Sequence, residues 1–81
     1  MISKNDLRGK YVTYIDDHGA RRTERVVRID GNHLTVRHII TINGRTRRFP
    51  KRRIYKDRVL GRQLPKKGLE PIRWGRGKKA A

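Results

Sequence analysis

Residues 33–49 read HLTVRHIITINGRTRRF and carry the clearest secondary-structure signal of the chain. Apolar and polar side chains alternate from His33 to Ile42, with Ile39 as the exception. An alternation with a period of two predicts a β-strand over residues 33–42 and is hard to reconcile with a helix. Asn43-Gly44 then predicts a tight hairpin, because both residues accept the positive φ of a type I′ turn. We therefore expect residues 45–49 to return as the partner strand.

Further short strands are predicted on both sides of this hairpin. Residues 10–15 and 22–29 are rich in aromatic and β-branched side chains, and turn-forming residues 16–19 and 30–32 follow them. Pro50 ends ladder pairing, and residues 53–55 form a short last strand. Five short strands without a convincing helix predict an all-β fold, a small five-stranded SH3-like or Sm-like barrel. The expected core comprises Val12, Tyr14, Val27, Ile29, Leu34, Val36, Ile40, Ile42, Phe49 and Ile54.

The barrel is predicted to span residues 10–61. Residues 1–9 form a leader with a loop or one helical turn, and residues 62–81 form a basic, extended C-terminal arm that contains Gly and Pro. Two interpretations of Trp74 in this arm are open. It either stacks on an unpaired base or folds back to cap an open end of the barrel.

The charge is large and unevenly distributed. The chain of 81 residues carries 23 Lys and Arg against 7 Asp and Glu, a net charge of +16. Residues 1–44 hold eight bases and five acids, whereas residues 45–81 hold fifteen bases and two acids. Such a block of like charge repels itself unless an anion neutralises it. Arginine, which makes forked contacts with phosphate, outnumbers lysine by 15 to 8. Nucleic acid is the favoured partner.

Other classes of function fit the sequence poorly. No cysteine is present, no apolar run approaches the roughly 18–20 residues that span a bilayer, and the first ten residues lack an export signal. We therefore expect a cytoplasmic protein without a membrane partner. His18, His33 and His38 have no metal-ligand spacing, and Asp16-Asp17 is a turn rather than a catalytic pair. No catalytic residue, metal or cofactor is predicted.

The predicted nucleic-acid site centres on the basic stretch that follows the hairpin turn. These bases can follow a phosphate backbone without reading base edges, so DNA and RNA are both open as partners. The candidate site residues are Arg25, Arg37, Arg45, Arg47, Arg48, Lys51, Arg52, Arg53, Lys56, Arg58, Arg73, Trp74, Arg76, Lys78 and Lys79.

A family resemblance covers residues 11–55. The run Tyr14-Ile15-Asp16, Arg25-Val26 and then Arg47, Phe49, Arg53 and Ile54 resembles the WYL domain, an Sm-like SH3-type β-barrel. The Trp-Tyr-Leu signature is missing, and only Leu34 stands in its place. The resemblance implies a ligand-sensing or nucleic-acid-binding barrel of transcription, phage or defence systems. It also implies that Arg25, Arg47 and Arg53 bind anions. The missing signature and the basic second half favour a polynucleotide over a small ligand.

The function expected from the sequence is an accessory or regulatory nucleic-acid-binding barrel of transcription, phage or plasmid systems. Two alternatives are open: a ribosomal structural protein that binds rRNA, and a basic module that binds an acidic protein partner. The sequence also leaves open a homodimer or a larger ribonucleoprotein assembly.

Overall fold

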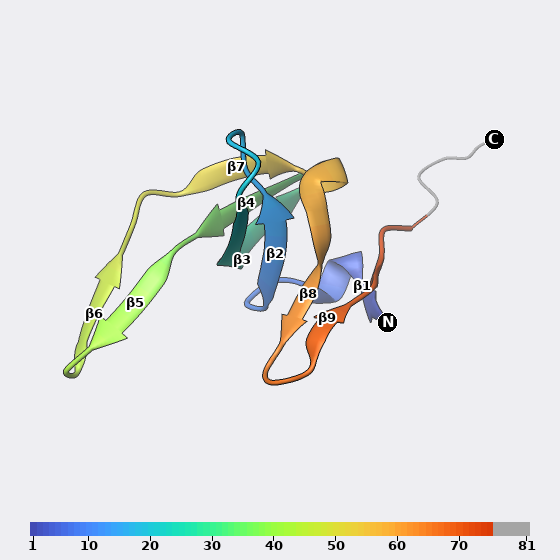
Figure 1. The fold of residues 1–81 in the computed structure, drawn as a ribbon. Helices are drawn as coiled ribbons and strands as arrows, with labels where there is room; N and C mark the ends of the chain where they lie inside the picture. The colour runs from blue at the N-terminus through green and yellow to red at the C-terminus, as the bar shows by residue number, and fades with distance from the viewer. Residues whose placement is uncertain (76–81) are drawn as a thin grey trace.

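The computed structural model describes residues 1–75, which form an all-β fold (Figure 1). The described chain contains ten strands and two short 3₁₀ turns, η1 (Lys4–Asp6) and η2 (Lys56–Arg58). The strands are β1 (Ile2–Ser3), β2 (Tyr11–Ile15), β3 (Arg21–Asp30), β4 (His33–Arg37), β5 (Ile39–Ile42), β6 (Arg45–Arg48), β7 (Arg52–Tyr55), β8 (Val59–Leu64), β9 (Gly68–Glu70) and β10 (Ile72–Arg73).

One six-stranded antiparallel sheet forms the body, in the order β7-β4-β3-β2-β8-β9. Its edge strands β7 and β9 do not pair with each other, so the sheet is open rather than a closed barrel. The strands expected over residues 10–15, 22–29 and 53–55 are present within a residue or two of their predicted ends. The alternation and the Gly-containing turns account for this agreement, because both signals are local.

The core lies on one side of this sheet. Its buried side chains come from β2, β3, β4 and β7, with two more from the N-terminal segment. Of the expected core, Val12, Tyr14, Leu34, Val36 and Ile54 are buried, and Ile29 packs against them. Val27 is replaced in the core by Val26, because the register of β3 against β4 shifts between Val26 and Arg28.

The β5–β6 hairpin leaves the body instead of covering it (Figure 1). The strand expected over residues 33–42 is broken at His38, where residues 37–38 of one strand face residues 49–51 of the other. Pro50 has no N–H to continue the ladder, and the extra residue bends the chain. The expectation that Ile40, Ile42 and Phe49 are core residues is therefore wrong: Ile42 is 62% and Phe49 is 36% exposed.

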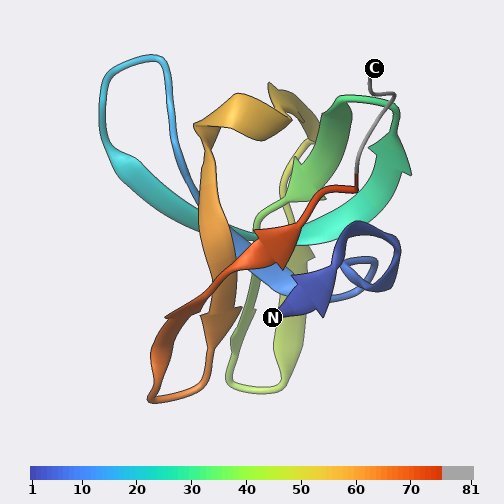
Figure 2. The same ribbon diagram turned by 90° about the vertical axis from the view of Figure 1, so that its right-hand side faces the viewer.

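The predicted extended arm is partly folded. Arg62 to Leu64 belong to β8, β9 pairs back on it, and β10 pairs in parallel with β1, as Figure 2 shows near the N-terminus. Trp74 and Ile72 pack against the core, which agrees with the capping interpretation of Trp74. The predicted leader contains one helical turn, as expected, but its Ile2 and Leu7 are core residues.

Replacing Tyr14 with Phe should not destabilise the fold, although Tyr14 is fully buried. Its Oη lies near the Glu24 carboxylate but makes no hydrogen bond of good geometry among the described residues, and an unsatisfied buried hydroxyl costs about 1–3 kcal/mol. Burial, together with the negative charge of Glu24, raises the pKa of Tyr14 above its ordinary value of 10.0. In the wild type, the Tyr14 hydroxyl therefore ionises in the unfolded chain before it does so in the folded protein as the pH rises past 10. The free energy of unfolding decreases in this pH range. Denaturant unfolding should show Tyr14→Phe at least as stable as the wild type at neutral pH. The difference should grow in alkali, and a loss of about 1 kcal/mol at neutral pH would contradict the prediction.

Candidate nucleic-acid interface

An irregularity in β3 places two arginines on the same side of the sheet. Arg25 lies opposite Arg37, and Arg28 lies opposite Thr35. Because residues 35 and 37 of β4 share a face, Arg25 and Arg28 share it as well, although three residues separate them. A regular strand would send them to opposite faces, and the β-bulge at Val27 removes that difference. This face, which we call the outer face, is the one opposite the core.

A turn of the N-terminal segment adds a further arginine to this region. The Gly9 N–H donates to the Val26 carbonyl oxygen (2.9 Å), and the Val26 N–H donates to the Lys10 carbonyl oxygen (2.8 Å). Gly9 adopts a φ of +82°, and the Arg25 guanidinium lies at van der Waals distance, 3.8 Å, from the position that a Cβ on Gly9 would occupy. These bonds fix Arg8 beside the bulge of β3.

Four arginines line one hollow at this place. The hollow has a volume of about 420 Å³, and we call it the arginine hollow. Its guanidinium groups come from three parts of the chain: the N-terminal turn, the β3–β4 pair and β6. Its lining is Arg8, Gly9, Arg25, Val26, Val27, Arg37, Ile39 and Arg48.

The arginine hollow is electrostatically unbalanced. No carboxylate lines it, and none of its four arginines forms an ion pair within residues 1–75. Arg25 and Arg37 are direct cross-strand neighbours, an arrangement that destabilises a sheet when the charges are alike. The Arg37 Nε is buried and lacks a hydrogen-bond partner among the described residues. An anion in the hollow would relieve both costs.

The carboxylates of the chain are engaged elsewhere. Five of the seven form ion pairs in the described structure, for example Glu24 with Arg22 at 3.0 Å and Asp30 with Arg53 at 3.7 Å. Between Asp30 and Asp57 the sequence contains no acidic residue at all. The basic side chains of residues 31–56 can therefore form ion pairs only with acidic residues from other segments, as Arg53 does with Asp30.

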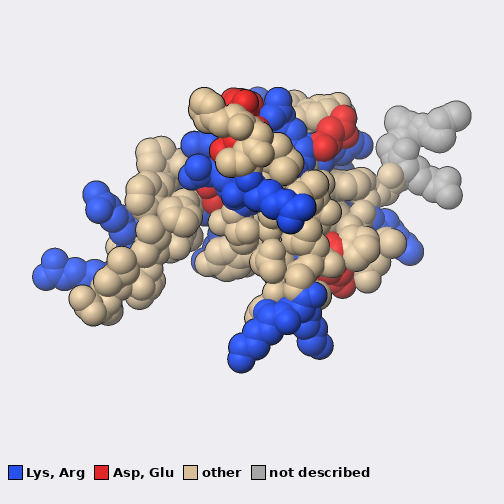
Figure 3. All heavy atoms as spheres, viewed as in Figure 1, with Lys and Arg blue, Asp and Glu red and all other residues tan. Residues whose placement is uncertain are grey.

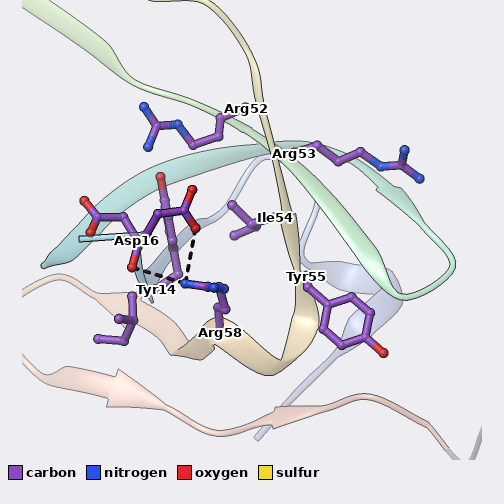
Figure 4. Close-up of a pocket in the computed structure, with 9 residues that line it drawn as sticks. Tyr14, Asp16, Arg52, Arg53, Ile54, Tyr55 and Arg58 are labelled. Atoms are coloured by element: carbon purple, nitrogen blue, oxygen red, sulfur yellow. Dashed lines mark hydrogen bonds and ion pairs between the residues drawn. The ribbon is translucent and has the colours of Figure 1, made fainter. Parts of the chain in front are cut away.

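Asp16 serves the turn that follows β2. Its Oδ1 accepts hydrogen bonds from the backbone N–H groups of Ala20 and His18, both at 2.9 Å, and these lower the pKa of Asp16. Arg58 donates to the Asp16 carbonyl oxygen (3.2 Å) and pairs with Asp17 (3.4 Å), beside the small pocket in Figure 4. This pair fixes η2 against the turn, so Arg58 has a structural partner.

The basic stretch after the hairpin turn is divided between several surfaces. Arg45 and Arg47 lie on one face of the β5–β6 hairpin with Phe49, whereas Arg48 lies on the other face and enters the arginine hollow. Figure 4 shows Arg52 and Arg53 pointing to opposite sides of β7.

Lys51 and Arg52 line a second hollow with Arg22 and Glu24. Arg53 lies on the outer face, opposite Thr35, and is paired with Asp30. Of the three positions taken from the family resemblance, Arg25 and Arg53 therefore share a face, and Arg47 lies apart from them.

The remaining predicted residues are less central. Lys56 is half-buried, Arg73 is exposed in β10, and Trp74 is partly buried against the core. The predicted positions Arg76, Lys78 and Lys79 lie outside the described residues.

Sequence reasoning missed Arg8 and Arg28, which lie in the nearly neutral first half of the chain. The odd spacing of Arg25 and Arg28 hides their common face, and only the bulge reveals it.

Basic side chains also gather at the free ends of the two hairpins (Figure 3). The β8–β9 turn carries Lys66 and Lys67, which the sequence analysis did not include. Both are exposed, and neither forms an ion pair in the described structure. The described surface is thus basic well beyond the arginine hollow.

We compared the chain with protein-family models, with curated proteins and with solved structures. No match was found. Within residues 1–75, no cluster of three His, Asp or Glu side chains is placed to hold a metal ion, and no helix has the length and apolarity to cross a bilayer.

Proposed function

We propose that this protein binds nucleic acid through its phosphates, with the arginine hollow as the central contact. The observation that carries the proposal is the convergence of four arginines, unpaired within the described chain, in one hollow without a carboxylate. Guanidinium groups make charge-assisted, forked hydrogen bonds with phosphate oxygens. A bound phosphate would offset the repulsion between Arg25 and Arg37 and give the Arg37 Nε an acceptor.

A polymer explains the surroundings better than a small anion does. Basic residues continue from the hollow along the outer face to Arg28 and Arg53, and along the hairpin to Arg45 and Arg47. A single phosphate would leave Arg28, Arg45 and Arg47 without an acidic partner among the described residues, whereas a phosphate backbone passes from one to the next. Lys51 and Arg52 add to the basic surface at the bend after Pro50, where Arg52 points to the opposite side of β7 from Arg53 (Figure 4). The proposed role is an accessory or regulatory one in transcription, phage or plasmid systems, carried out in the cytoplasm.

We propose that the fold is an open relative of the SH3-like and Sm-like barrels. In support, five strands follow one another as β2, β3, β4, β7 and β8, and the last of them returns to pair with the first. The 3₁₀ turn η2 carries the chain from β7 to β8. Membership of the WYL group is a further part of this proposal, with Arg25 in the hollow and Arg53 on the same outer face as the anion-binding positions.

The affinity for polynucleotide should fall steeply with salt. If about six phosphates are neutralised, the slope of log K against log salt concentration is about −4 to −5. Fluorescence anisotropy with labelled oligonucleotides between about 50 and 300 mM salt measures it. A slope shallower than about −2 would leave too few phosphate contacts for the proposal.

The natural partner can be identified by purifying the protein from cells and testing the bound polymer with DNase and RNase. Recovery of a nuclease-sensitive polymer supports the proposal. Sedimentation with a ribosomal subunit after a high-salt wash would instead favour the structural rRNA role. Indifference to all polynucleotides at physiological salt would favour an acidic protein partner.

A further inference from the structure

The β5–β6 hairpin is a free-standing two-stranded ribbon. Its strands pair only with each other, through four residue pairs from Ile39↔Arg48 to Ile42↔Arg45. The turn at its tip has the predicted positive φ values, 53° at Asn43 and 78° at Gly44. At about 3.4 Å per residue the paired part is roughly 14 Å long, and the bend at Pro50 directs it away from the sheet. Nothing in the described structure covers the face that carries Arg45 and Arg47.

That face combines arginines with aliphatic side chains in cross-strand pairs. Ile40 lies opposite Arg47, and Ile42 lies opposite Arg45. With Asn43 and Phe49 they line an open hollow of about 590 Å³. Ile42 is 62% exposed next to the tip, and the whole hairpin contains no acidic residue. Solvent alone does not favour an exposed isoleucine opposite an arginine, whereas an anionic partner with apolar patches matches both side-chain types.

A second copy of this chain fits the face poorly. A two-fold interface would bring Arg45 and Arg47 of each copy close to the same residues of the other, and the hairpin has no carboxylate to compensate. A single strand also fits poorly, because single-strand binding relies on aromatic platforms. Phe49 is the only aromatic of this face, and it is already in contact with His38 (ring centroids 5.1 Å apart) and with Arg47 (5.7 Å).

We propose that the β5–β6 hairpin enters the major groove of B-form DNA, an inference that rests on the proposed function. The major groove, about 12 Å wide and 8.5 Å deep, admits a two-stranded ribbon, and the minor groove, about 6 Å wide, does not. Arginine forks match the O6 and N7 acceptors of guanine, and an aliphatic side chain packs on the thymine methyl group. Arg45, Arg47 and Ile42 provide these groups on the exposed face. The deep, narrow major groove of A-form RNA excludes such a ribbon.

The arginine hollow lies at the base of the same hairpin and completes this arrangement. Arg48 is on the opposite face from Arg45 and Arg47, and it lines the hollow with Arg25 and Arg37. The ribbon thus presents base-reading groups on one face and phosphate-binding groups on the other. Phosphates that border the groove lie within reach of the hollow while the tip is inside the groove.

The experiment compares a B-form DNA duplex, an RNA duplex of the same sequence and the single DNA strand by fluorescence anisotropy. The wild type should bind the DNA duplex about tenfold more tightly than the other two. The double variant Arg45→Gln, Arg47→Gln should lose most of this preference while its binding to single strands falls only a few-fold. The matched control is Lys66→Gln, Lys67→Gln, which removes the same charge from the other hairpin tip. It should weaken all three alike.

Modified bases test the groove itself. Replacing thymine with uracil removes only the major-groove methyl group, and 7-deazaguanine removes only the N7 acceptor. Either change should weaken the wild type several-fold, and Ile42→Thr should lose the response to uracil. Equal affinity for the three polymers overturns this inference and leaves the proposed function standing. The same holds if neither uracil nor 7-deazaguanine changes the affinity of the wild type. Binding to none of the polymers overturns both. A dimer of the free protein that Ile42→Thr dissociates would assign the face to self-association and overturn the inference.

Discussion

Replacing Arg25 with Glu should lower the affinity for polynucleotide about 10- to 100-fold and at the same time stabilise the free protein. Arg25 lines the arginine hollow, so the change removes a phosphate contact and adds repulsion, and charge-assisted contacts are worth about 1.5–3 kcal/mol. In the free protein, the introduced carboxylate would lie opposite Arg37. An opposite-charge cross-strand pair contributes roughly 0.2–1 kcal/mol, where the wild type has repulsion. Oligonucleotide titration and thermal unfolding of the same sample measure the two effects.

Arg21→Glu is the matched control for this experiment. Arg21 lies on the same strand, is exposed, does not line the hollow, and gives the same change in net charge. It should weaken binding only a few-fold through the general field of the protein. If Arg21→Glu and Arg25→Glu weaken binding equally, net charge alone governs affinity and the hollow is not the site. A lower melting temperature for Arg25→Glu would show that Arg25 and Arg37 do not repel each other as their register implies.

Replacing Leu7 with Ala should destabilise the protein by about 2–5 kcal/mol. Leu7 is fully buried, and such a truncation loses both the transfer free energy and the contacts around the cavity. Since a domain of this length is stable by only about 4–12 kcal/mol, a large share of the variant should be unfolded in mild denaturant. The backbone bonds from Leu7 to Lys4 and from Lys10 to Leu7 survive the change, so the loss reports on packing. Urea unfolding followed by circular dichroism gives the value.

Leu60→Ala serves as the comparison, because Leu60 is 42% exposed and the change removes the same atoms. It should cost about 1 kcal/mol or less. Equal costs for the two variants would mean that the N-terminal segment is not part of the core. The next residue, Arg8, lines the arginine hollow. If Leu7→Ala is as stable as the wild type and binds oligonucleotides normally, packing of Leu7 is not needed to position Arg8 in the hollow.

The strands of the body and the hairpin turn could be predicted because their signals are local. Alternation marks β2, β3 and β4, and Asn43-Gly44 fixes its turn by backbone preference alone. The break at His38 could not be predicted, since it depends on how Pro50 faces it across the ladder. The pairing of β1 with β10 has no local signal either. Two-residue strands show no period, and Ile2 and its partner Ile72 lie at opposite ends of the described chain.

The sequence could predict the type of group that the candidate site would bind, but not which residues come together to form it. The excess of arginine indicates a phosphate-containing partner. Of the residues predicted to bind it, Arg25, Arg37 and Arg48 line one hollow in the structure. Arg8 and Arg28 were missed because a bulge and a backbone-bonded turn decide their positions. Arg53 and Arg58 were predicted to bind nucleic acid, and in the structure each forms an ion pair with an acid distant in sequence. Charge density along a chain cannot reveal such pairing.

The parallel pair of β1 and β10 also constrains the order of folding. Ile2 is paired with Ile72, so the first strand has no partner until nearly all of the described chain has been synthesised. Contacts between such distant positions close late, because the loop they enclose is long. A nascent chain would therefore expose Ile2 until β10 emerges, and premature release short of residue 72 should yield a product that chaperones retain and proteases degrade.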